Sequence, residues 1–338
     1  MSTNLISETR NHFETYFRNT VLDNCPTEIL DLRDEVSYHF GWDGSANVLG
    51  KRLRPLILIL TYASLGGKPN EAFRAASALE VFHNFTLIHD DIYDRGEVRH
   101  GHPALWRNIG IPLAINVGDY LAGLSQYLMG TLPNNFLIET QKESQHEFQD
   151  ASLAVIQGQQ LDIQYEKAER VSVEEYLSMI RLKTARLFSA AFAIGAKLKG
   201  CDGEFSEKLK RLGSDLGLGF QIQDDYLGIW GSSKETGKST GTDLLTRKLT
   251  FPTMTGLSNS TVFQQLWKQE NQADDWLLFE MKGHLERAAI REDTINFARA
   301  FYIDVQTNLN QLLPFRNEYA QALMSLVTSM FAPVLLDS

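Results

Sequence analysis

Apolar residues recur with a 3.6-residue period over several long windows of this 338-residue chain. Because that period is the spacing of one helix face, each window predicts a helix with a buried side. Alternating runs typical of strands are scarce, and so are the Asn-Gly and Asp-Gly pairs of hairpin turns. We therefore expect an all-α fold, a bundle of roughly ten or more helices. The windows are residues 72–88, 113–129, 174–198, 263–278 and 294–313.

No shift in composition marks a domain boundary, so we expect a single domain over residues 1–338, with its motifs between 45 and 255. The net charge of −10 and a pI near 5.3 argue against a surface that binds nucleic acid. Cys25 and Cys201 stand alone in the sequence, which is typical of a reducing cytoplasm. Residues 1–10 lack the apolar core of a signal peptide. The longest apolar run, residues 56–65, is too short to cross a membrane. We therefore expect a cytoplasmic protein with no transmembrane segment.

Paired aspartates follow apolar runs at two places, Asp90-Asp91 and Asp224-Asp225, and Asp94 lies four residues after Asp90. On a helix, the Cβ atoms of Asp90 and Asp94 would be about 5–6 Å apart, so a cation is needed between the two carboxylates. Carboxylate oxygens suit Mg²⁺, which keeps other positions for water and substrate phosphate. Two such clusters on facing helices would bind one polyanion through several Mg²⁺ ions. An acidic, solvated helix end is the alternative interpretation.

Three cations, Lys51, Arg52 and Arg54, gather just before an apolar segment. Gly50 permits a tight backbone there, and Pro55 suits the first turn of the helix that we expect to follow. Cations at a helix N-terminus oppose the helix dipole, whereas an anion is favoured. The pattern therefore predicts that an external polyanion binds here, although a solvated basic loop would have the same composition.

Two further groups are placed near the acids by spacing alone. His83 lies seven residues before Asp90, two helical turns away on nearly the same face. A lone histidine is more often an ordinary core or surface residue, so this spacing is a weak signal. A turn after Asp94 would bring Arg99 and His100 back beside the acids.

Together these motifs resemble the trans-isoprenyl diphosphate synthases, also called polyprenyl synthetases, and most closely the short-chain geranylgeranyl and farnesyl types. The likeness extends from residue 50 to residue 252, and the order and spacing of its motifs make it specific. The resemblance implies the isoprenoid synthase fold, an all-α bundle around a central cavity. The matching motifs are Gly50-Lys51-Arg52-x-Arg54-Pro55, His83, Asp90-Asp91-x-x-Asp94, Arg99, Gly118-Asp119, Gly158-Gln159-Gln160-Leu161-Asp162, Lys183-Thr184, Phe220-Gln221-x-x-Asp224-Asp225, Gly237-Lys238, and Asp243 with Lys248.

The resemblance also implies an activity and a set of roles. Members of the family join isopentenyl diphosphate head to tail to an allylic diphosphate with Mg²⁺, usually as homodimers. The expected Mg²⁺ ligands are Asp90, Asp91, Asp94, Asp224 and Asp225, with Asp91 in a supporting role. The expected contacts of isopentenyl diphosphate are Lys51, Arg54 and His83, and Arg52 and His100 are expected to bind substrate as well. The expected contacts of the allylic diphosphate are Arg99, Lys183 and Lys238, with Lys248 nearby. Lys183, Thr184 and Gln221 are the expected catalytic residues, and Thr184 and Gln221 would face the carbocation.

Product length is predicted from Phe85 and Thr86, five and four residues before Asp90. In the family, an aromatic residue at the first of these positions acts as a floor that stops elongation. The smaller Thr86 resembles the geranylgeranyl type, so we expect mainly geranylgeranyl diphosphate, with farnesyl diphosphate as the alternative. Phe85 could also be ordinary core, with the floor set by Phe82 or by a neighbouring helix.

Three positions depart from the family pattern. Gly228 stands where many relatives have a third aspartate, His100 replaces an arginine, and Leu49 replaces a glycine. These departures put in doubt the metal affinity of the second motif and the affinity for isopentenyl diphosphate. A terpene cyclase and a non-catalytic partner subunit of a heteromeric synthase are the competing interpretations. A cyclase would not need the cations at residues 50–55, and a partner subunit would be expected to lack acids.

Overall fold

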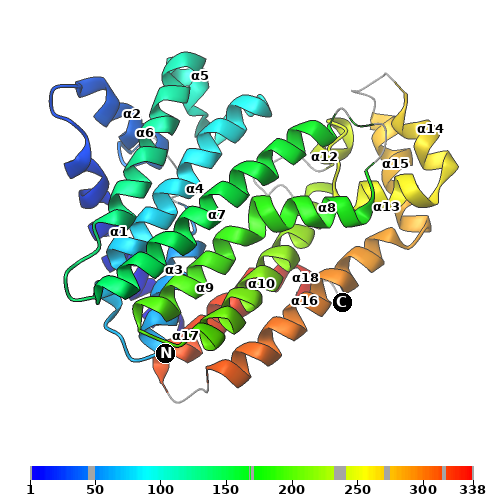
Figure 1. The fold of residues 1–338 in the computed structure, drawn as a ribbon. Helices are drawn as coiled ribbons and strands as arrows, with labels where there is room; N and C mark the ends of the chain where they lie inside the picture. Colours follow the sequence, from blue (N-terminus) through cyan, green and yellow to red (C-terminus); the bar gives the residue numbers. More distant parts are fainter. Residues whose placement is uncertain are drawn as a thin grey trace. The chain divides into compact units, whose positions relative to one another are not determined.

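The computed structural model describes residues 2–44, 50–166, 168, 171–231, 241–269, 275–313 and 317–336 (Figure 1). These residues are overwhelmingly α-helical, which confirms the all-α prediction. The strands of the described ranges, β1 (Val98–Arg99) and β2 (His102–Pro103), pair as one short antiparallel hairpin. None of the described helices is both long enough and apolar enough to cross a membrane.

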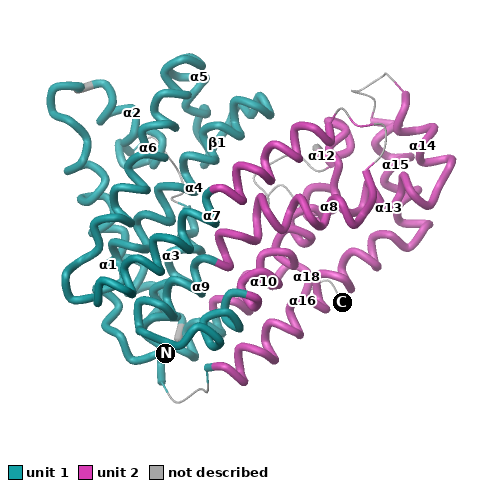
Figure 2. The backbone as a smooth tube through the Cα atoms, viewed as in Figure 1, with its two compact units in different colours: residues 1–152, 190–210, 313–325 teal, residues 153–189, 211–312, 326–338 magenta. Residues whose placement is uncertain are grey.

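The chain divides into two compact units, each assembled from three separate stretches (Figure 2). Unit 1 consists of Met1–Ser152, Ala190–Lys210 and Leu313–Ser325. Unit 2 consists of Leu153–Ser189, Arg211–Leu312 and Leu326–Ser338. The expectation of a single domain stays a prediction, because the units alternate along the chain.

Unit 1 contains the N-terminal helices together with parts of four later ones. Its own helices are α1 (Ser2–Asn24), α2 (Leu30–Phe40), α3 (Leu53–Ser64), α4 (Phe73–Tyr93), α5 (Leu105–Ile109) and α6 (Ile111–Gly130), with a 3₁₀ turn η1 (Pro69–Ala72) before α4. The helices α7 (Ile138–Tyr165), α9 (Arg186–Leu198), α10 (Gly203–Trp230) and α17 (Glu318–Met330) contribute residues to both units.

Unit 2 contains the remaining helices. They are α8 (Val173–Ile180), the π-helical segment η2 (Arg181–Ala185), α12 (Thr242–Leu245), α13 (Phe251–Asn259), α14 (Thr261–Trp267), α15 (Asp275–Arg287), α16 (Ile290–Leu312) and α18 (Ala332–Leu336).

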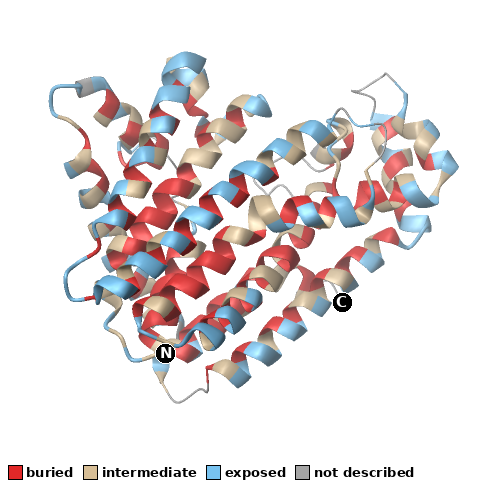
Figure 3. Cartoon of the chain, viewed as in Figure 1, coloured by how far each residue is buried: buried red, intermediate tan, exposed pale blue. Residues whose placement is uncertain are grey.

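Burial in unit 1 follows from the pattern of apolar residues (Figure 3). Every residue of α3 from Pro55 to Ala63 is buried, as expected for the longest apolar run of the chain. Around it, α1 and α2 bury one face each, whereas α4 is buried on all sides from Ala75 to Phe82. An aromatic cluster closes this core near α1, where Phe17 contacts Phe40 and Trp42 with ring centroids 5.3 and 5.4 Å apart.

Four of the five predicted windows correspond to helical structure. Residues 72–88, 113–129 and 294–313 fall almost entirely within α4, α6 and α16, and 174–198 covers α8, η2 and α9 without a break in helicity. A single helix over 263–278 is wrong, because α14 ends at Trp267 and α15 begins at Asp275. The intervening residues 268–274 are polar but for Ala273, so they offer no apolar face to bury.

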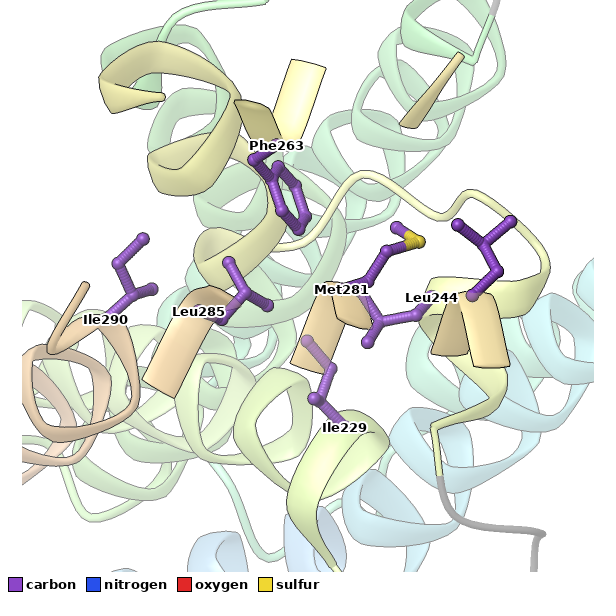
Figure 4. Packing of buried hydrophobic residues seen from close by; sticks show 7 residues of the cluster. Ile229, Leu244, Phe263, Met281, Leu285 and Ile290 are labelled. Atoms are coloured by element: carbon purple, nitrogen blue, oxygen red, sulfur yellow. The ribbon is translucent and has the colours of Figure 1, made fainter. Parts of the chain in front are cut away.

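The far part of unit 2 has its own apolar cluster, which joins α10, α12, α14, α15 and α16. Its buried members are Ile229, Leu244, Phe263, Leu277, Met281, Leu285 and Ile290. Figure 4 shows the Ile229, Leu244 and Met281 side chains gathered at one end of the cluster. Trp230, Leu257, Leu266, Trp267 and Leu278 pack around it. This packing fixes α12 against the end of α10.

Candidate active site

The middle cation of the basic motif is buried in unit 1, with only 4% of Arg52 exposed. Its guanidinium donates to Glu14 from Nε (2.9 Å) and Nη2 (3.0 Å), and to Glu80 from Nη1 (2.9 Å). It also lies over the rings of Phe17 and Phe40. Burial alone would lower the pKa of Arg52, but the two glutamates outweigh it and raise that pKa. This placement favours a structural role for Arg52 over the substrate contact that the motif predicts.

The backbone conformation at Arg52 separates the buried cation of the Gly50–Pro55 motif from the other two. Arg52 has a positive φ of 53° at the N-cap of α3, and a Cβ on Gly50 would lie 2.9 Å from Nη1 of Arg52. Glycine at position 50 thus leaves room for the guanidinium in its present position. Lys51 is exposed, whereas Arg54 is half-buried on the first turn of α3.

Arg54 approaches His83 of α4, with Nη1 3.0 Å from Nε2. Because a guanidinium can only donate, Nε2 of His83 accepts and Nδ1 carries the proton. Burial, with the charges of Arg54 and Arg99 nearby, lowers the pKa of His83 well below its ordinary value. Burial also lowers the pKa of Arg54 to about 10, so Arg54 stays charged at neutral pH. The pair therefore carries one positive charge.

The acids at the end of α4 divide into two kinds. Asp91 is buried and accepts two hydrogen bonds from Arg99, at 2.5 Å from Nη2 and 3.1 Å from Nε. Asp90 is half-buried and Asp94 is exposed, where α4 ends and the Asp94 N–H donates to the Asp90 carbonyl (2.8 Å). The hairpin β1–β2 returns Arg99 to the acids, as the turn predicts. Asp91 therefore positions Arg99, and the outer two acids are the better candidates for metal ligands.

His100, which follows Arg99 in the chain, offers no charge to a diphosphate. His100 also has a positive φ of 53°. Burial, with Arg99 and Arg52 nearby, lowers the pKa of His100 to about 4. Because His100 stands where the family has an arginine, this part of unit 1 has one cation fewer at neutral pH.

The proposed length-determining residues lie one turn earlier on α4. The Phe85 ring is half-buried between Phe82, at 5.3 Å, and His89, at 4.8 Å. His89 fits against α6 because Gly118 has no Cβ, and a Cβ there would overlap the imidazole ring. The Thr86 hydroxyl is bonded to the His83 carbonyl at 2.7 Å. The role of Phe85 and Thr86 as a floor stays a prediction.

In unit 2, the second acid pair is divided in the same way as the first. Asp225 is buried and accepts hydrogen bonds from the Tyr176 hydroxyl, from Nε2 of Gln221 (3.0 Å) and from the Phe251 N–H (3.0 Å). Burial outweighs these bonds and raises the pKa of Asp225 to about 7. Asp224 is exposed. We infer that Asp225 joins α8, α10 and α13, which leaves Asp224 as the outer carboxylate.

The remaining catalytic candidates meet at a π-helical segment. The η2 turn carries Lys183, whose Nζ lies 2.5 Å from Asp162, and Thr184, whose hydroxyl donates to Oε1 of Gln221 (2.8 Å). A Cβ on Gly158 would lie 2.7 Å from the Lys183 Cα, so only glycine lets α7 pass this close. Single π turns of this kind are frequent at functional sites.

Two predicted residues remain, Lys238 and Lys248. Lys238 lies outside the described residues. Lys248 is exposed, and its N–H donates to the Asp243 carbonyl at 2.9 Å.

Sequence reasoning missed Glu14, Glu80 and Tyr176, which hold Arg52 and Asp225. These residues could have been identified only as partners of a buried charge, and burial is not known before the fold is.

Within the described ranges, no group of three or more acidic, histidine or cysteine side chains converges tightly enough to hold a metal ion. The outer carboxylates Asp90, Asp94 and Asp224 nevertheless fit Mg²⁺, which takes one or two carboxylates and completes its shell with water and phosphate. Hard oxygen donors at the ends of α4 and α10 are the chemistry that such an ion requires.

The family profile of the polyprenyl synthetases matches residues 43–277. A geranylgeranyl diphosphate synthase of Saccharolobus solfataricus is 34% identical over 304 residues, 85% of this chain and 86% of that protein. A (2E,6E)-farnesyl diphosphate synthase of Mycobacterium bovis is 34% identical over 226 residues, 65% of this chain and 62% of that one. The crystal structure of a polyprenyl synthetase from Streptomyces coelicolor superposes with a TM-score of 0.86 at 31% identity, and covers 98% of this chain and 99% of that one. The chain belongs to the polyprenyl synthetase family.

The buried ion pairs of Arg52 predict a large effect on stability. Glu80→Ala leaves a buried guanidinium short of one partner, so we expect the free energy of unfolding to fall by about 3–5 kcal/mol. The exposed pair of Glu97 with Arg107, 3.7 Å apart, is the control, and Glu97→Ala should cost less than about 1 kcal/mol. Urea denaturation measures both variants. Equal small losses would contradict the role given to Glu80.

The buried His39 predicts how stability depends on pH. Its Nε2 lies 3.0 Å from Oδ1 of Asn84, and burial lowers its pKa from 6.5 to about 3. The folded state therefore excludes a proton that the unfolded chain binds, so stability is present above pH 6.5 and is lost as the pH falls toward 3. At pH 5 the cost is about 2 kcal/mol.

His39→Gln removes the cost of keeping this histidine neutral in the folded state. Between pH 7.5 and pH 5 the variant should therefore lose about 2 kcal/mol less stability than the parent. Denaturation curves at the two pH values measure the difference. Parallel losses in parent and variant would show that His39 is not the group that titrates.

Proposed function

We propose that this protein is a Mg²⁺-dependent prenyltransferase that condenses isopentenyl diphosphate with an allylic diphosphate. The main product is geranylgeranyl diphosphate, and farnesyl diphosphate is the alternative. The observation that carries the proposal is that unit 1 has cations at the start of α3 and outward carboxylates at the end of α4. Lys51 and Arg54 would bind one diphosphate directly, whereas Asp90 and Asp94 would bind the other through metal ions, with Arg99 beside the acids.

The first step breaks the carbon–oxygen bond of the allylic diphosphate and leaves an allylic cation and pyrophosphate. Bound Mg²⁺ would supply positive charge to the leaving group. In unit 1, Asp90 and Asp94 would hold such a metal ion, and Arg99 adds fixed positive charge. In unit 2, Asp224 would be a metal ligand, and Lys183 is a fixed cation. Because Asp91 and Asp162 already orient these two cations, little reorganisation is needed when the bond breaks.

In the second step, the double bond of isopentenyl diphosphate attacks the allylic cation and a carbon–carbon bond forms. A proton then leaves the adjacent carbon, and the departed pyrophosphate accepts it. Thr184 and Gln221 present oxygen atoms to the cation, and their mutual hydrogen bond fixes both. The apolar faces of the helices keep water from the cation.

The same proposal includes a homodimer. Four large apolar side chains of α6 are exposed, namely Ile111, Leu113, Ile115 and Tyr127, at 46, 50, 41 and 55%. Exposed apolar side chains of this kind are typical of a subunit interface. A cytoplasmic location is part of the proposal too, and it rests on the lone cysteines of the sequence.

The proposal is tested with purified protein, Mg²⁺, labelled isopentenyl diphosphate and geranyl or farnesyl diphosphate as the allylic partner. We expect extension only when both diphosphates are present, with a twenty-carbon product. A terpene cyclase would release hydrocarbon from the allylic diphosphate alone, and a partner subunit would be inactive alone. Either outcome would overturn the proposal.

The proposed metal ligands predict a large loss of turnover. Asp90→Ala and Asp224→Ala should each lower kcat at least about 100-fold at ordinary Mg²⁺, because each removes a carboxylate from the metal. Asp23→Ala, at an exposed position of α1, is the control and should be unchanged. Near-parental rates in the Asp90 variant would rule out its role as a metal ligand.

The cationic motif predicts a selective effect on one substrate. Lys51→Ala and Arg54→Ala should raise KM for isopentenyl diphosphate about 10- to 100-fold, because a charge-assisted hydrogen bond of about 1.5–3 kcal/mol is lost. KM for the allylic diphosphate should change far less. Lys142→Ala, on the exposed side of α7, is the control. Equal effects on both substrates would mean that the two diphosphates are wrongly assigned.

The position of Phe85 predicts product length. Phe85→Ala should give products at least one isoprene unit longer, because the ring no longer blocks the growing chain. Phe279→Ala, at a 70% exposed residue of α15, removes an aromatic ring elsewhere and should leave products unchanged. An unchanged product distribution in the Phe85 variant would assign the floor to another residue.

A further inference from the structure

A small polar pocket lies in unit 1, and its lining residues belong to none of the motifs shared with the family. Its volume is about 310 Å³, at the lower end of the range for pockets that bind small molecules. The pocket lies where α9 ends and α10 begins, and α7 contributes one lining residue. The side chains that matter for its chemistry are Glu143, Lys197, Cys201, Asp202, Ser206 and Lys210.

Two lysines of this pocket share one buried carboxylate. Glu147 is 3% exposed, and its Oε2 lies 2.9 Å from Nζ of Lys210 and 3.6 Å from Nζ of Lys197. Both lysine side chains are themselves only 22% exposed. In the described part of the chain, Glu147 is the one carboxylate that pairs with either lysine. Two largely buried cations therefore face one anion, and their remaining N–H donors are available to a ligand.

The hydroxyl of Ser206 indicates a ligand independently of the lysines. Ser206 lines the pocket from the first turn of α10 and is 3% exposed, and its Oγ has no hydrogen-bond partner among the described residues. The buried hydroxyls of Ser77 and Ser152 differ, because each donates to the carbonyl four residues earlier at 2.8 Å. A buried hydroxyl without a partner is unfavourable, and a ligand that accepts its hydrogen bond removes this cost.

The acidic side chains at the pocket limit the charge of that ligand. They are exposed, so water screens them, whereas the largely buried lysines act through less solvent. Oδ1 of Asp202 also caps α10, where it accepts from the Phe205 N–H (2.8 Å). Among the described residues, these acids do not form a group that could hold a metal ion. A polyanion would be repelled here, so the pocket suits a small anion of low charge. The three acids are Glu143, Asp202 and Glu207.

We propose that this pocket binds a small phosphate-type oxyanion, either free phosphate or the phosphate group of a small monoester. Phosphate oxygens are strong hydrogen-bond acceptors with a charge of about −1.5 to −2 at neutral pH. They therefore match the ammonium groups of Lys197 and Lys210 together with the hydroxyl of Ser206. The inference goes beyond the proposed function, because it assigns no step of the reaction to this pocket.

The thiol of Cys201 tests the proposal locally, because this residue lines the pocket. Its alkylation by iodoacetamide is measured by mass spectrometry at increasing inorganic phosphate, with sodium chloride at equal ionic strength as the reference. We expect phosphate to slow the alkylation of Cys201 at least about 5-fold, and to leave the slow reaction of the buried Cys25 unchanged. A second arm uses glycerol 3-phosphate, and protection at lower concentration than phosphate identifies a monoester as the ligand. Absence of protection by both compounds, or equal protection by sodium chloride, would overturn the inference.

A pair of lysine variants separates a specific contact from net charge. Lys197→Met removes one cation and leaves Lys210 paired with Glu147, and the phosphate concentration that half-protects Cys201 should rise at least about 10-fold. Lys208→Met is the matched control, because it removes the same charge from α10 at a side chain that is 55% exposed and does not line the pocket. The control should be protected like the parent. Equal shifts in the two variants would overturn the inference.

Ser206→Ala separates a ligand contact from a role in the fold. Because the hydroxyl has no partner in the described part of the protein, its removal should not lower the Tm of the ligand-free protein. The phosphate concentration for half-protection of Cys201 should rise about 5- to 10-fold. A lower Tm with parental protection would assign the hydroxyl to the fold and contradict the inference.

Discussion

The buried ion pairs of Arg52 are the interaction on which the proposed isopentenyl diphosphate site depends. One guanidinium joins Glu14 of α1 to Glu80 of α4, and it does so from the residue that begins α3. Burying a guanidinium is unfavourable unless it is paired, so this group fixes the backbone at the start of α3, between Lys51 and Arg54. Because the inner cation is paired within the protein, we propose only the outer two as contacts of the substrate.

The acidic motifs follow the same division of labour. In each pair, one aspartate is buried and hydrogen-bonded within the protein, Asp91 to Arg99 and Asp225 to Tyr176. The other aspartate stays outside. A carboxylate that must hold a metal ion needs a rigid support, and the buried partner could provide it from the adjacent position. Adjacent acids thus have different environments, and the proposed site gives them different functions.

Much of the helical fold follows from periodicity, because α6 and α16 each bury one continuous apolar face. Periodicity did not predict the end of α14 at Trp267, because apolar residues on both sides of the polar stretch continue the helical spacing. The role of Arg52 could not be predicted from local sequence. Glu14 lies 38 residues from Arg52 and Glu80 lies 28 residues away, and no local pattern links them.

The ion pairs of Arg52 with Glu14 and Glu80 hold Lys51 and Arg54 in position, and one combined variant tests this most directly. Glu14→Gln, Arg52→Met and Glu80→Gln are combined, so that no unpaired charge remains buried and the protein can fold. Steady-state kinetics of the folded triple variant then give KM for each substrate. We predict a raised KM for isopentenyl diphosphate, because Lys51 and Arg54 lose their fixed support, and an unchanged KM for the allylic diphosphate. A parental KM for isopentenyl diphosphate in the folded triple variant would contradict the account.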